Sequence, residues 1–394
     1  MIKAASVQTY EIDDLSLACR EIAAQLNEKL TLMSNSVGIV QCDPEFIEAG
    51  IMGLLYDTLR IPLVGGTTIS IATNDEIGNH MFSMLVLTSD DVEFAASRTT
   101  GFSDDYYGAI ERSVSASVKA SEKPLRMALV FPVVSDRDDL PGDIYVETIE
   151  RLCGNISIFG TLSVDDALEK FDRSMSVFNG EAFNNEVTYV LFFGNVNPRF
   201  FVATVPHQSS VTDTVPLITK SEGQVIKEIN NKVAIHYFED LGFAAEGKLA
   251  AGVYFVPLLI TRQDAEGDKH TFVRALIGFN SDGFAVCRGN IPQGAQIAFG
   301  SLQSSEVLGA TSEIADEISC EREVSAALIF SCIIRQISIG SDALKELAII
   351  KDLLHDNVPF MASYSGGEIA PIGCNVAENM KNSFHNYSLI ACLL

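Results

Sequence analysis

Apolar and polar positions along the chain repeat one local order three times. A short, uniformly apolar segment is followed by a polar break, by a stretch with apolar residues three and four positions apart, and by a second apolar segment. The uniform segments are typical of strands buried on both faces, and the spacing is typical of an amphipathic helix. The copies begin at VGIVQCDPEF, MALVFPVVSD and AALIFSCIIR, have helices predicted at 44–59, 142–153 and 342–355, and end at IPLVGGTTIS, ISIFGTLSVDD and VPFMASYSGGE.

A further strand or hairpin follows each copy, so the recurring unit has the order β-α-β-β. We therefore predict an α/β fold with two related domains, in which helices cover mixed β-sheets and α/β/β/α layering is one arrangement. Sequence identity between the copies is low. Two explanations stay open: duplication of one unit, or convergent patterning of ordinary βαβ units.

One stretch between the second and third copies has no period. Residues 206–221 contain polar side chains and two prolines, which is typical of a linker or crossover. This break predicts one domain over 1–205 and another over 222–394. Beyond it, we expect a helix over 222–242 and strands over 253–260 and 271–277.

Charge and hydropathy exclude several classes of protein. There are 27 basic and 52 acidic residues, for a net charge of −25, and no basic cluster that could neutralise nucleic-acid phosphates or bind an anionic membrane surface. The longest apolar run, LAAGVYFVPLLI, is shorter than the roughly 20 residues that span a bilayer. The first residues lack the apolar core of a signal peptide. We therefore expect a cytoplasmic protein that does not insert into membranes.

Common catalytic and cofactor motifs are missing from the sequence. It has no phosphate-binding loop, no dinucleotide fingerprint, no H-E-x-x-H and no G-x-S-x-G. The six histidines lack metal-ligand spacing. The eight cysteines are scattered, mostly in apolar runs and without a C-x-x-C pair, which is typical of reduced thiols in a cytosolic protein. We expect no metal and no cofactor.

Polar residues gather at the strand ends of the third copy, where open α/β sheets bind ligands. Arg335 can hold a carboxylate in a bidentate fork, Glu368 can hold an amine, and a Gly pair lets the backbone approach a ligand. These groups suit a zwitterion or a carboxylate-bearing small molecule. The predicted ligand-binding residues are Cys332, Arg335, Ser363, Tyr364, Ser365, Gly366, Gly367, Glu368, His385 and Asn386.

Each of these residues also has a structural interpretation. Cys332 fits a buried core thiol, Arg335 fits an ion pair with a nearby acid, and the Gly pair fits a turn. Glu368, His385 and Asn386 fit hydrogen bonds that cap a turn or a strand entry. In the N-terminal half, 65–68 and 160–163 occupy the same strand-end position, and they fit either a second site or tight turns.

The C-terminal motifs resemble those of the FIST (F-box and intracellular signal transduction) sensory domains. The resemblance rests on F-S-C-x-x-R, then P-x-x-x-x-Y-x-G-G-E-I-x-P, then F-H-N-x-[ST]-L, and more weakly on V-G-G-[ST]-[ST] and V-F-x-G-E in the first half. It covers 37–394. Ile334 departs from the pattern, since the family usually has Gly before the Arg.

The resemblance implies a sensory protein that binds a small ligand, amino acids included. Such domains accompany histidine kinases, chemotaxis receptors or cyclic-di-nucleotide enzymes. The predicted core uses nearly all 394 residues, so we expect the signal to pass to a separate partner of one of these kinds.

Two other functions stay open at this point. One is an acyl-transfer or hydrolytic enzyme with Cys332 as nucleophile, His385 as base and Glu368 as the orienting group. The apolar run around Cys332 argues against the exposure that such a thiol needs. The other is a pure interaction scaffold. We favour the sensory protein, and so a chain that is not an enzyme.

Overall fold

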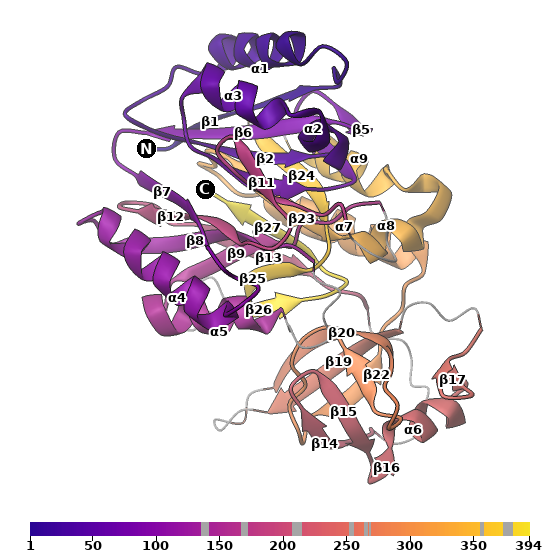
Figure 1. Cartoon of the computed structure of the whole chain (residues 1–394). Coiled ribbons are helices and arrows are strands. Elements are labelled where there is room, and N and C mark those ends of the chain that lie inside the picture. The colour runs from indigo at the N-terminus through magenta and orange to yellow at the C-terminus, as the bar shows by residue number, and fades with distance from the viewer. Residues whose placement is uncertain are drawn as a thin grey trace.

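The structure is a computed structural model that describes residues 1–134, 142–166, 172–206, 215–251, 256–263, 267, 269–354, 358–372 and 381–394. Helices and mixed sheets alternate along the chain (Figure 1), which confirms the α/β class. Among the helices of these segments, none combines the length and the apolar character that a bilayer crossing requires.

The predicted recurring unit is present in three copies, and each copy is longer than the sequence pattern indicates. Every unit starts with an edge strand and a helix, continues through the β-α-β element, extends into a hairpin and ends with a return strand. The parallel pairs are β2 with β3, β8 with β9, and β23 with β24. In each unit the return strand pairs antiparallel with the first strand of that pair.

The first and second units follow each other without interruption. Unit 1 contains β1 (Lys3–Thr9), α1 (Leu15–Lys29), β2 (Asn35–Cys42), α2 (Pro44–Ala49), α3 (Ile51–Leu59), β3 (Leu63–Thr67), β4 (Ser70–Thr73), β5 (Ile77–Asn79) and β6 (Phe82–Ser89). Unit 2 contains β7 (Glu93–Arg98), α4 (Tyr106–Ser117), η1 (Val118–Ala120), β8 (Leu125–Phe131), α5 (Asp143–Cys153), β9 (Ser157–Thr161), β10 (Ser176–Phe178), β11 (Glu181–Phe183) and β12 (Thr188–Phe193).

The third unit is split by a long insertion after its edge strand. It contains β13 (Arg199–Ala203), then α7 (Ser304–Ser319), β23 (Ala327–Cys332), α8 (Ile333–Ile339), η2 (Gly340–Asp342), α9 (Lys345–Leu353), β24 (Phe360–Ser365), β25 (Glu368–Ile372), β26 (Lys381–His385) and β27 (Leu389–Leu393).

The units exchange their hairpins in a closed cycle. The sheet of unit 1 has the order β1-β6-β2-β3-β10-β11, that of unit 2 is β7-β12-β8-β9-β25-β26, and that of unit 3 is β13-β27-β23-β24-β4-β5. The hairpin β4–β5 of unit 1 therefore lies in the sheet of unit 3. The hairpin β25–β26 of unit 3 lies in the sheet of unit 2, and the hairpin β10–β11 of unit 2 lies in the sheet of unit 1. The same order in all three sheets favours duplication over convergent patterning.

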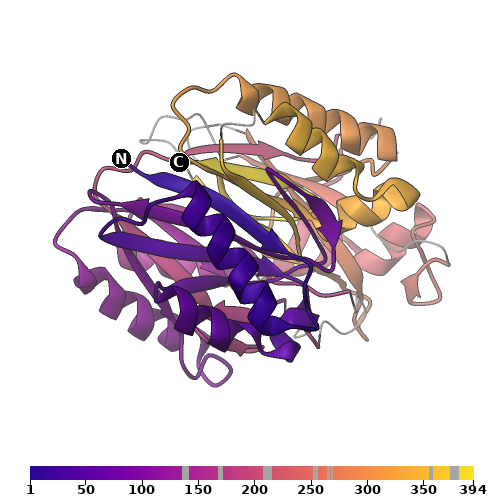
Figure 2. The same cartoon turned by 90° about the horizontal axis from the view of Figure 1, so that it is seen from above.

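The three sheets enclose one common core, and the helices lie outside it (Figure 2). Buried side chains from every sheet meet in this core, among them Val37, Leu129 and Phe330, and the Phe159 ring stacks on Phe330 with 5.3 Å between centroids. Separate outer clusters pack α1, α2 and α3 on the first sheet, α4 and α5 on the second, and α7 and α9 on the third. These shared faces and exchanged hairpins make the three units interdependent.

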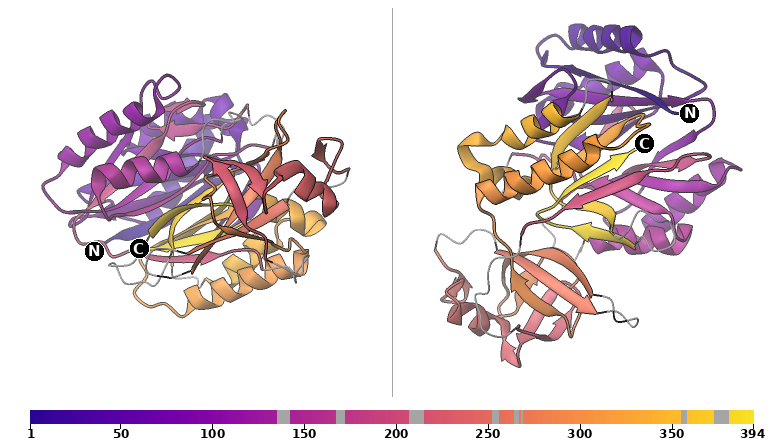
Figure 3. Two further views of the ribbon diagram at one scale, coloured as in Figure 1. Left: turned by 90° about the horizontal axis from the view of Figure 1, so that it is seen from below. Right: turned by 180° about the vertical axis from the view of Figure 1, so that it is seen from behind.

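The insertion forms a fourth sheet, which lies at one end of the three-sheet body (Figures 1 and 3). The break predicted at 206–221 includes the start of this sheet. The insertion contains β14 (Ile218–Glu222), β15 (Val225–Ile229), β16 (Lys232–Val233), α6 (Ala234–Asp240), β17 (Ala244–Ala245), β18 (Lys248–Leu249), β19 (Val256–Gln263), β20 (Lys269–Phe279), β21 (Ala285–Cys287) and β22 (Gln296–Phe299). Of these strands, β17 and β18 pair with each other in a separate two-stranded sheet.

The helix expected over 222–242 is wrong, because only Ala234–Asp240 is helical. Gly223, Asn230 and Asn231 have φ values of +55°, +51° and +61°, which are typical of turns and end a helix. The strand β15 lies between these turns. The helix predicted at 44–59 is broken for a similar reason, since Gly50 has φ +94° between α2 and α3.

Candidate functional site

The strand ends of the three units meet inside the body. Leu162 N–H donates to Gly367 O, and Gly366 N–H donates to Leu162 O, both at 2.9 Å. Val164 N–H donates to Thr67 O at 3.0 Å, and the Thr68 hydroxyl donates to Tyr364 O at 2.7 Å. The segments 65–68, 160–163 and 363–368, which the pattern placed at equivalent positions, are thus hydrogen-bonded to one another.

The glycines at these ends make room for protein atoms. A Cβ on Gly66 would lie 1.8 Å from Ser163 Oγ, and one on Gly366 would lie 1.9 Å from Val134 Cγ2. Gly367 has φ +158°, and its Cβ would lie 2.7 Å from the Phe384 ring. Close packing between strand ends therefore accounts for the glycines without a ligand.

Arg335 is fully buried and is held by an acid on α9. Its Nε and Nη2 donate to Glu346 Oε1 at 2.9 and 2.8 Å, and Nη2 also donates to Thr311 Oγ1 at 2.9 Å. Glu346 is fully buried as well, and its Oε2 accepts from Ser331 at 2.7 Å. The ion-pair interpretation of Arg335 therefore describes its position in the structure.

Cys332 and Glu368 form a buried pair near Arg335. Burial raises the pKa of the Glu368 carboxyl well above its usual range, even though the Ser388 N–H, at 3.3 Å, favours the charged form. Burial and the charge of Glu368 raise the pKa of the Cys332 thiol, against the opposing effect of the Ile334 and Tyr387 backbone. The Cys332 thiol is therefore protonated at neutral pH, and burial disfavours the charged form of Glu368.

His385 lies opposite Glu368 in the β25–β26 register. Its Nε2 lies 3.1 Å from Ala370 O, and burial lowers the pKa of its imidazole to about 4, so the ring is neutral at pH 7. Three buried atoms of this region, Glu368 Oε1, His385 Nδ1 and Tyr387 Oη, have no hydrogen-bond partner among the described residues.

The other predicted residues bind protein groups. Asn386 Oδ1 accepts from Ala275 N–H at 3.1 Å, Ser363 Oγ donates to Gln41 at 3.1 Å, and Tyr364 Oη donates to Ala343 O at 3.0 Å. Ser365 Oγ donates to Gly367 O at 2.6 Å. The structure thus brings Cys332, Ser365, Glu368 and His385 together in the protein interior, beside an Arg335 that is already paired.

Alkylation tests whether Cys332 is reactive. We expect iodoacetamide at neutral pH to modify the exposed Cys320 while Cys332 stays unmodified, because a buried, protonated thiol is a poor nucleophile. Mass spectrometry after partial reaction measures both sites, and the urea-unfolded chain, where both should react, is the control. Equal rates at the two thiols in the native protein would instead support the enzyme hypothesis.

Within the described segments, one group of side chains has the spacing of a metal site. Ligand atoms of Asp43, Glu45 and His80 lie within 4.8 Å of one another. Asp43 Oδ1 accepts from Glu45 N–H at 2.9 Å and so caps α2, and its Oδ2 lies 2.9 Å from His80 Nδ1. A helix cap with a neighbouring histidine explains this arrangement.

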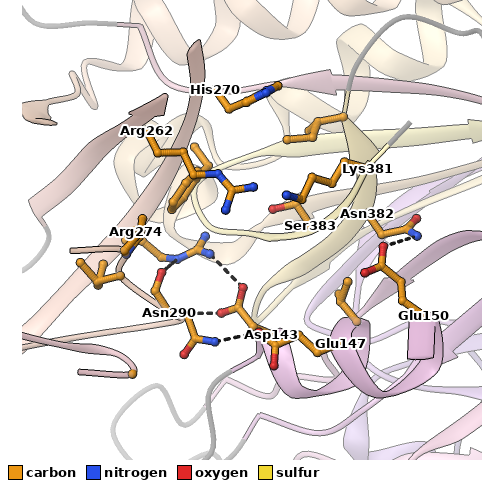
Figure 4. Close-up of a pocket in the computed structure, with 16 residues that line it drawn as sticks. Asp143, Glu147, Glu150, Arg262, His270, Arg274, Asn290, Lys381, Asn382 and Ser383 are labelled. Carbon is orange, nitrogen blue, oxygen red and sulfur yellow. Dashed lines mark hydrogen bonds and ion pairs between the residues drawn. The ribbon is translucent and has the colours of Figure 1, made fainter. Parts of the chain in front are cut away.

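A pocket of about 430 Å³ lies between the inserted sheet and the body (Figure 4). Its walls come from β19 and β20 on one side, and from α5 and β26 on the other. We call it the seam pocket. It is lined by Asp143, Val146, Glu147, Glu150, Gly223, Arg262, His270, Phe272, Arg274, Asn290, Ile291, Pro292, Ile372, Lys381, Asn382 and Ser383.

Two cationic side chains extend into the seam pocket from opposite walls. Figure 4 shows Arg262 of β19 and Lys381 of β26 pointing toward each other. The Arg262 Nε is buried and has no hydrogen-bond partner in the described part of the chain, and no described acid forms an ion pair with Lys381. Arg274 is different, because it is buried and donates to Asp143 at 3.0 Å and to Phe384 O at 2.9 Å. Arg262 and Lys381 are therefore the cations placed to receive a carboxylate.

Carboxylates from one face of α5 line the other side. Asp143, Glu147 and Glu150 follow each other at spacings of four and three, which puts them on one helix face. Partial burial and the charge of Asp143 raise the pKa of Glu147. A bound ammonium would relieve this repulsion. Glu147 and Glu150 each accept one amide hydrogen bond, from Asn290 at 3.0 Å and from Asn382 at 2.8 Å.

The sequence prediction missed the seam pocket, because its walls come from three distant parts of the chain. Glu147 belongs to unit 2, Arg262 to the insertion, and Lys381 to a hairpin that crosses from unit 3 into the sheet of unit 2. One signal was available, since D-x-x-x-E-x-x-E in the helix at 142–153 predicts an acidic face.

The α/β body and its charged pocket define an architecture, and comparison with known families is more specific. A model of the FIST N domain matches residues 36–232, and a model of the FIST C domain matches 234–371. The chain therefore belongs to the FIST family of sensory signal-transduction domains. The two matches meet between β16 and α6, within the inserted sheet. No curated protein matches the chain significantly.

Proposed function

We propose that this protein is a sensory protein that binds a small molecule bearing both a carboxylate and an amine, and that the seam pocket is its site. Membership of the FIST family supports the sensory role. The observation that carries the ligand class is that Arg262 and Lys381 line the same pocket as the acidic face of α5. Free amino acids and related small carboxylates have the matching charges.

The proposed location differs from the one that the motifs indicate. The strand-end cluster of Cys332, Ser365, Glu368 and His385 is buried beside an Arg335 that is paired with Glu346, and the seam pocket lies next to this cluster on β26. Arg274 and Asn386 connect the inserted sheet to this strand and to the residue that follows it. A ligand that binds residues of both pocket walls would therefore also shift β26 and the strand-end cluster that it carries.

The output of such a sensor would pass to a separate protein. We propose a cytoplasmic partner of the kinds that accompany FIST domains: a histidine kinase, a chemotaxis receptor or a cyclic-di-nucleotide enzyme. The enzyme alternative is disfavoured because Cys332 is buried and protonated. The scaffold alternative predicts no ligand at all, so binding measurements separate it from a sensor.

A thermal-shift screen of the amino acids and small dicarboxylates tests this function. We expect at least one to stabilise the protein, since ligand at a hundredfold excess over Kd adds about 2.7 kcal/mol. Arg262→Gln should then weaken binding about 10- to 100-fold, because a charge-assisted hydrogen bond is worth about 1.5–3 kcal/mol. Glu147→Gln should weaken the binding of ligands that bear an amine, and should leave the affinity for dicarboxylates without an amine nearly unchanged.

Arg112→Gln is the matched control, because Arg112 is an exposed arginine on α4 outside the seam pocket. It should leave the affinity unchanged. A panel without any hit, or a hit whose affinity is the same in the Arg262→Gln variant, would contradict the proposed function.

A further inference from the structure

The strand β26 lies at an open edge of its sheet. It is the last strand of the order β7-β12-β8-β9-β25-β26, and among the strands of the described residues it pairs only with β25. Its residues Lys381, Asn382 and Ser383 line the seam pocket. The edge of a sheet, with its row of backbone donors and acceptors, therefore forms part of the pocket wall.

The register shows which backbone groups face the pocket. Leu162 N–H donates to Gly367 O across the β9–β25 pair. Because hydrogen-bonded positions alternate along an antiparallel pair, Ile369 and Pro371 direct their backbone toward β9, and their β26 partners Phe384 and Asn382 direct theirs away from β25.

Two observations support this assignment of backbone directions. The Phe384 carbonyl accepts from Arg274 of the inserted sheet at 2.9 Å, so it does point outward. Asn382 lies opposite Pro371, which has no N–H to donate. The N–H and C=O of Asn382 consequently face the pocket, and no described residue hydrogen-bonds with either of them. The Asn382 side chain turns the other way, to Ile158 N–H at 2.8 Å.

The size of the seam pocket exceeds the needs of one amino acid. Its volume of about 430 Å³ equals that of roughly fourteen waters at about 30 Å³ each, and it falls in the range of pockets for drug-sized ligands. Phe272, Ile291 and Ile372 add apolar surface to the walls. The pocket therefore offers cationic side chains, carboxylates, the backbone N–H and C=O of Asn382, and apolar walls.

We propose that the seam pocket binds a short extended peptide of two or three residues, which pairs its backbone with β26 at Asn382. Arg262 and Lys381 hold the C-terminal carboxylate, and Glu147 and Glu150 hold the N-terminal ammonium. Main-chain pairing supplies affinity that a single amino acid cannot gain, since the latter has no internal peptide group. This inference rests on the proposed function, because it assigns the ligand class of the same site.

Isothermal calorimetry with trialanine and with alanine tests the proposal on the full chain. We expect trialanine to bind at least about tenfold more tightly than alanine. Methylation of the central peptide nitrogen removes one backbone donor and should weaken binding by about tenfold, since it leaves a backbone acceptor unpaired. An Ala-X-Ala set, with X varied over all residues, allows for a side-chain preference.

Modified peptides combined with variants assign the two ends. Amidation of the C-terminus should weaken binding about tenfold or more in the wild-type protein and have little effect in Arg262→Gln. Acetylation of the N-terminus should behave the same way toward the double variant Glu147→Gln/Glu150→Gln. Arg112→Gln should retain both penalties.

The two proposals fail in distinguishable ways. If a free amino acid binds as tightly as every peptide and depends equally on Arg262, the peptide inference is overturned and the proposed function stands. If the N-methylated peptide binds as well as trialanine, pairing with β26 is overturned. If neither amino acids nor peptides bind, both proposals are overturned.

Discussion

Replacing Arg335 with methionine is expected to destabilise the protein by about 3–5 kcal/mol, because removal of one partner leaves a buried charge uncompensated. Glu346 would keep hydroxyl partners such as Thr311 and Ser331 but lose its positive partner, and it is fully buried. The total stability of a domain is about 5–15 kcal/mol. The variant should therefore show a much lower midpoint in urea, with a reduced yield of folded protein.

The double variant Arg335→Met/Glu346→Leu is the informative comparison. It removes both charges and fills their space with apolar groups, so it should recover most of the lost stability. Arg199→Met is a control for the loss of an arginine, because Arg199 also pairs with a glutamate, Glu321, but at a partly exposed position. Its cost should stay within about 1 kcal/mol. A double variant as unstable as the single one would show that Arg335 acts through contacts other than the pair.

The sequence predicted the residues of the strand-end cluster and left two roles open for them, ligand contacts or structural partners. The motifs placed Cys332, Glu368 and His385 near one another, and the structure does bring them together. The sequence could not show that Glu346 lies on α9 beside Arg335, since a glutamate in a helix is usually exposed. The structure shows Arg335 in an internal ion pair, which is one of the two interpretations that the sequence left open.

The same limit applies to the fold. Uniformly apolar segments identified β2, β8 and β23, and the helical spacing of apolar residues identified the helices predicted at 44–59, 142–153 and 342–355, because both patterns are local. The hairpins β4–β5, β10–β11 and β25–β26 are also local, but the sheet that each joins depends on packing between units. A period within one segment carries no information on that choice, so neither the exchange nor the seam pocket could be predicted.

The exchange has a direct consequence for residues 1–205, which we expect not to fold on their own. In this fragment, β4 lacks its partner β24 and β13 lacks its partner β27. The common core loses the side chains that the third unit contributes, which include Leu328, Phe330 and Ile390. At about 1.5–3 kcal/mol for each large buried side chain, this loss is comparable with the whole stability of a domain.

Circular dichroism and urea unfolding measure the outcome. The isolated fragment should lack near-ultraviolet signals, bind a hydrophobic dye and unfold without a cooperative transition. Coexpression with residues 206–394 should restore a folded complex, since the cut then leaves every strand pair available. A fragment 1–205 that unfolds cooperatively alone would show that two units suffice for a stable core, and that the hairpin cycle adds stability without being required for folding.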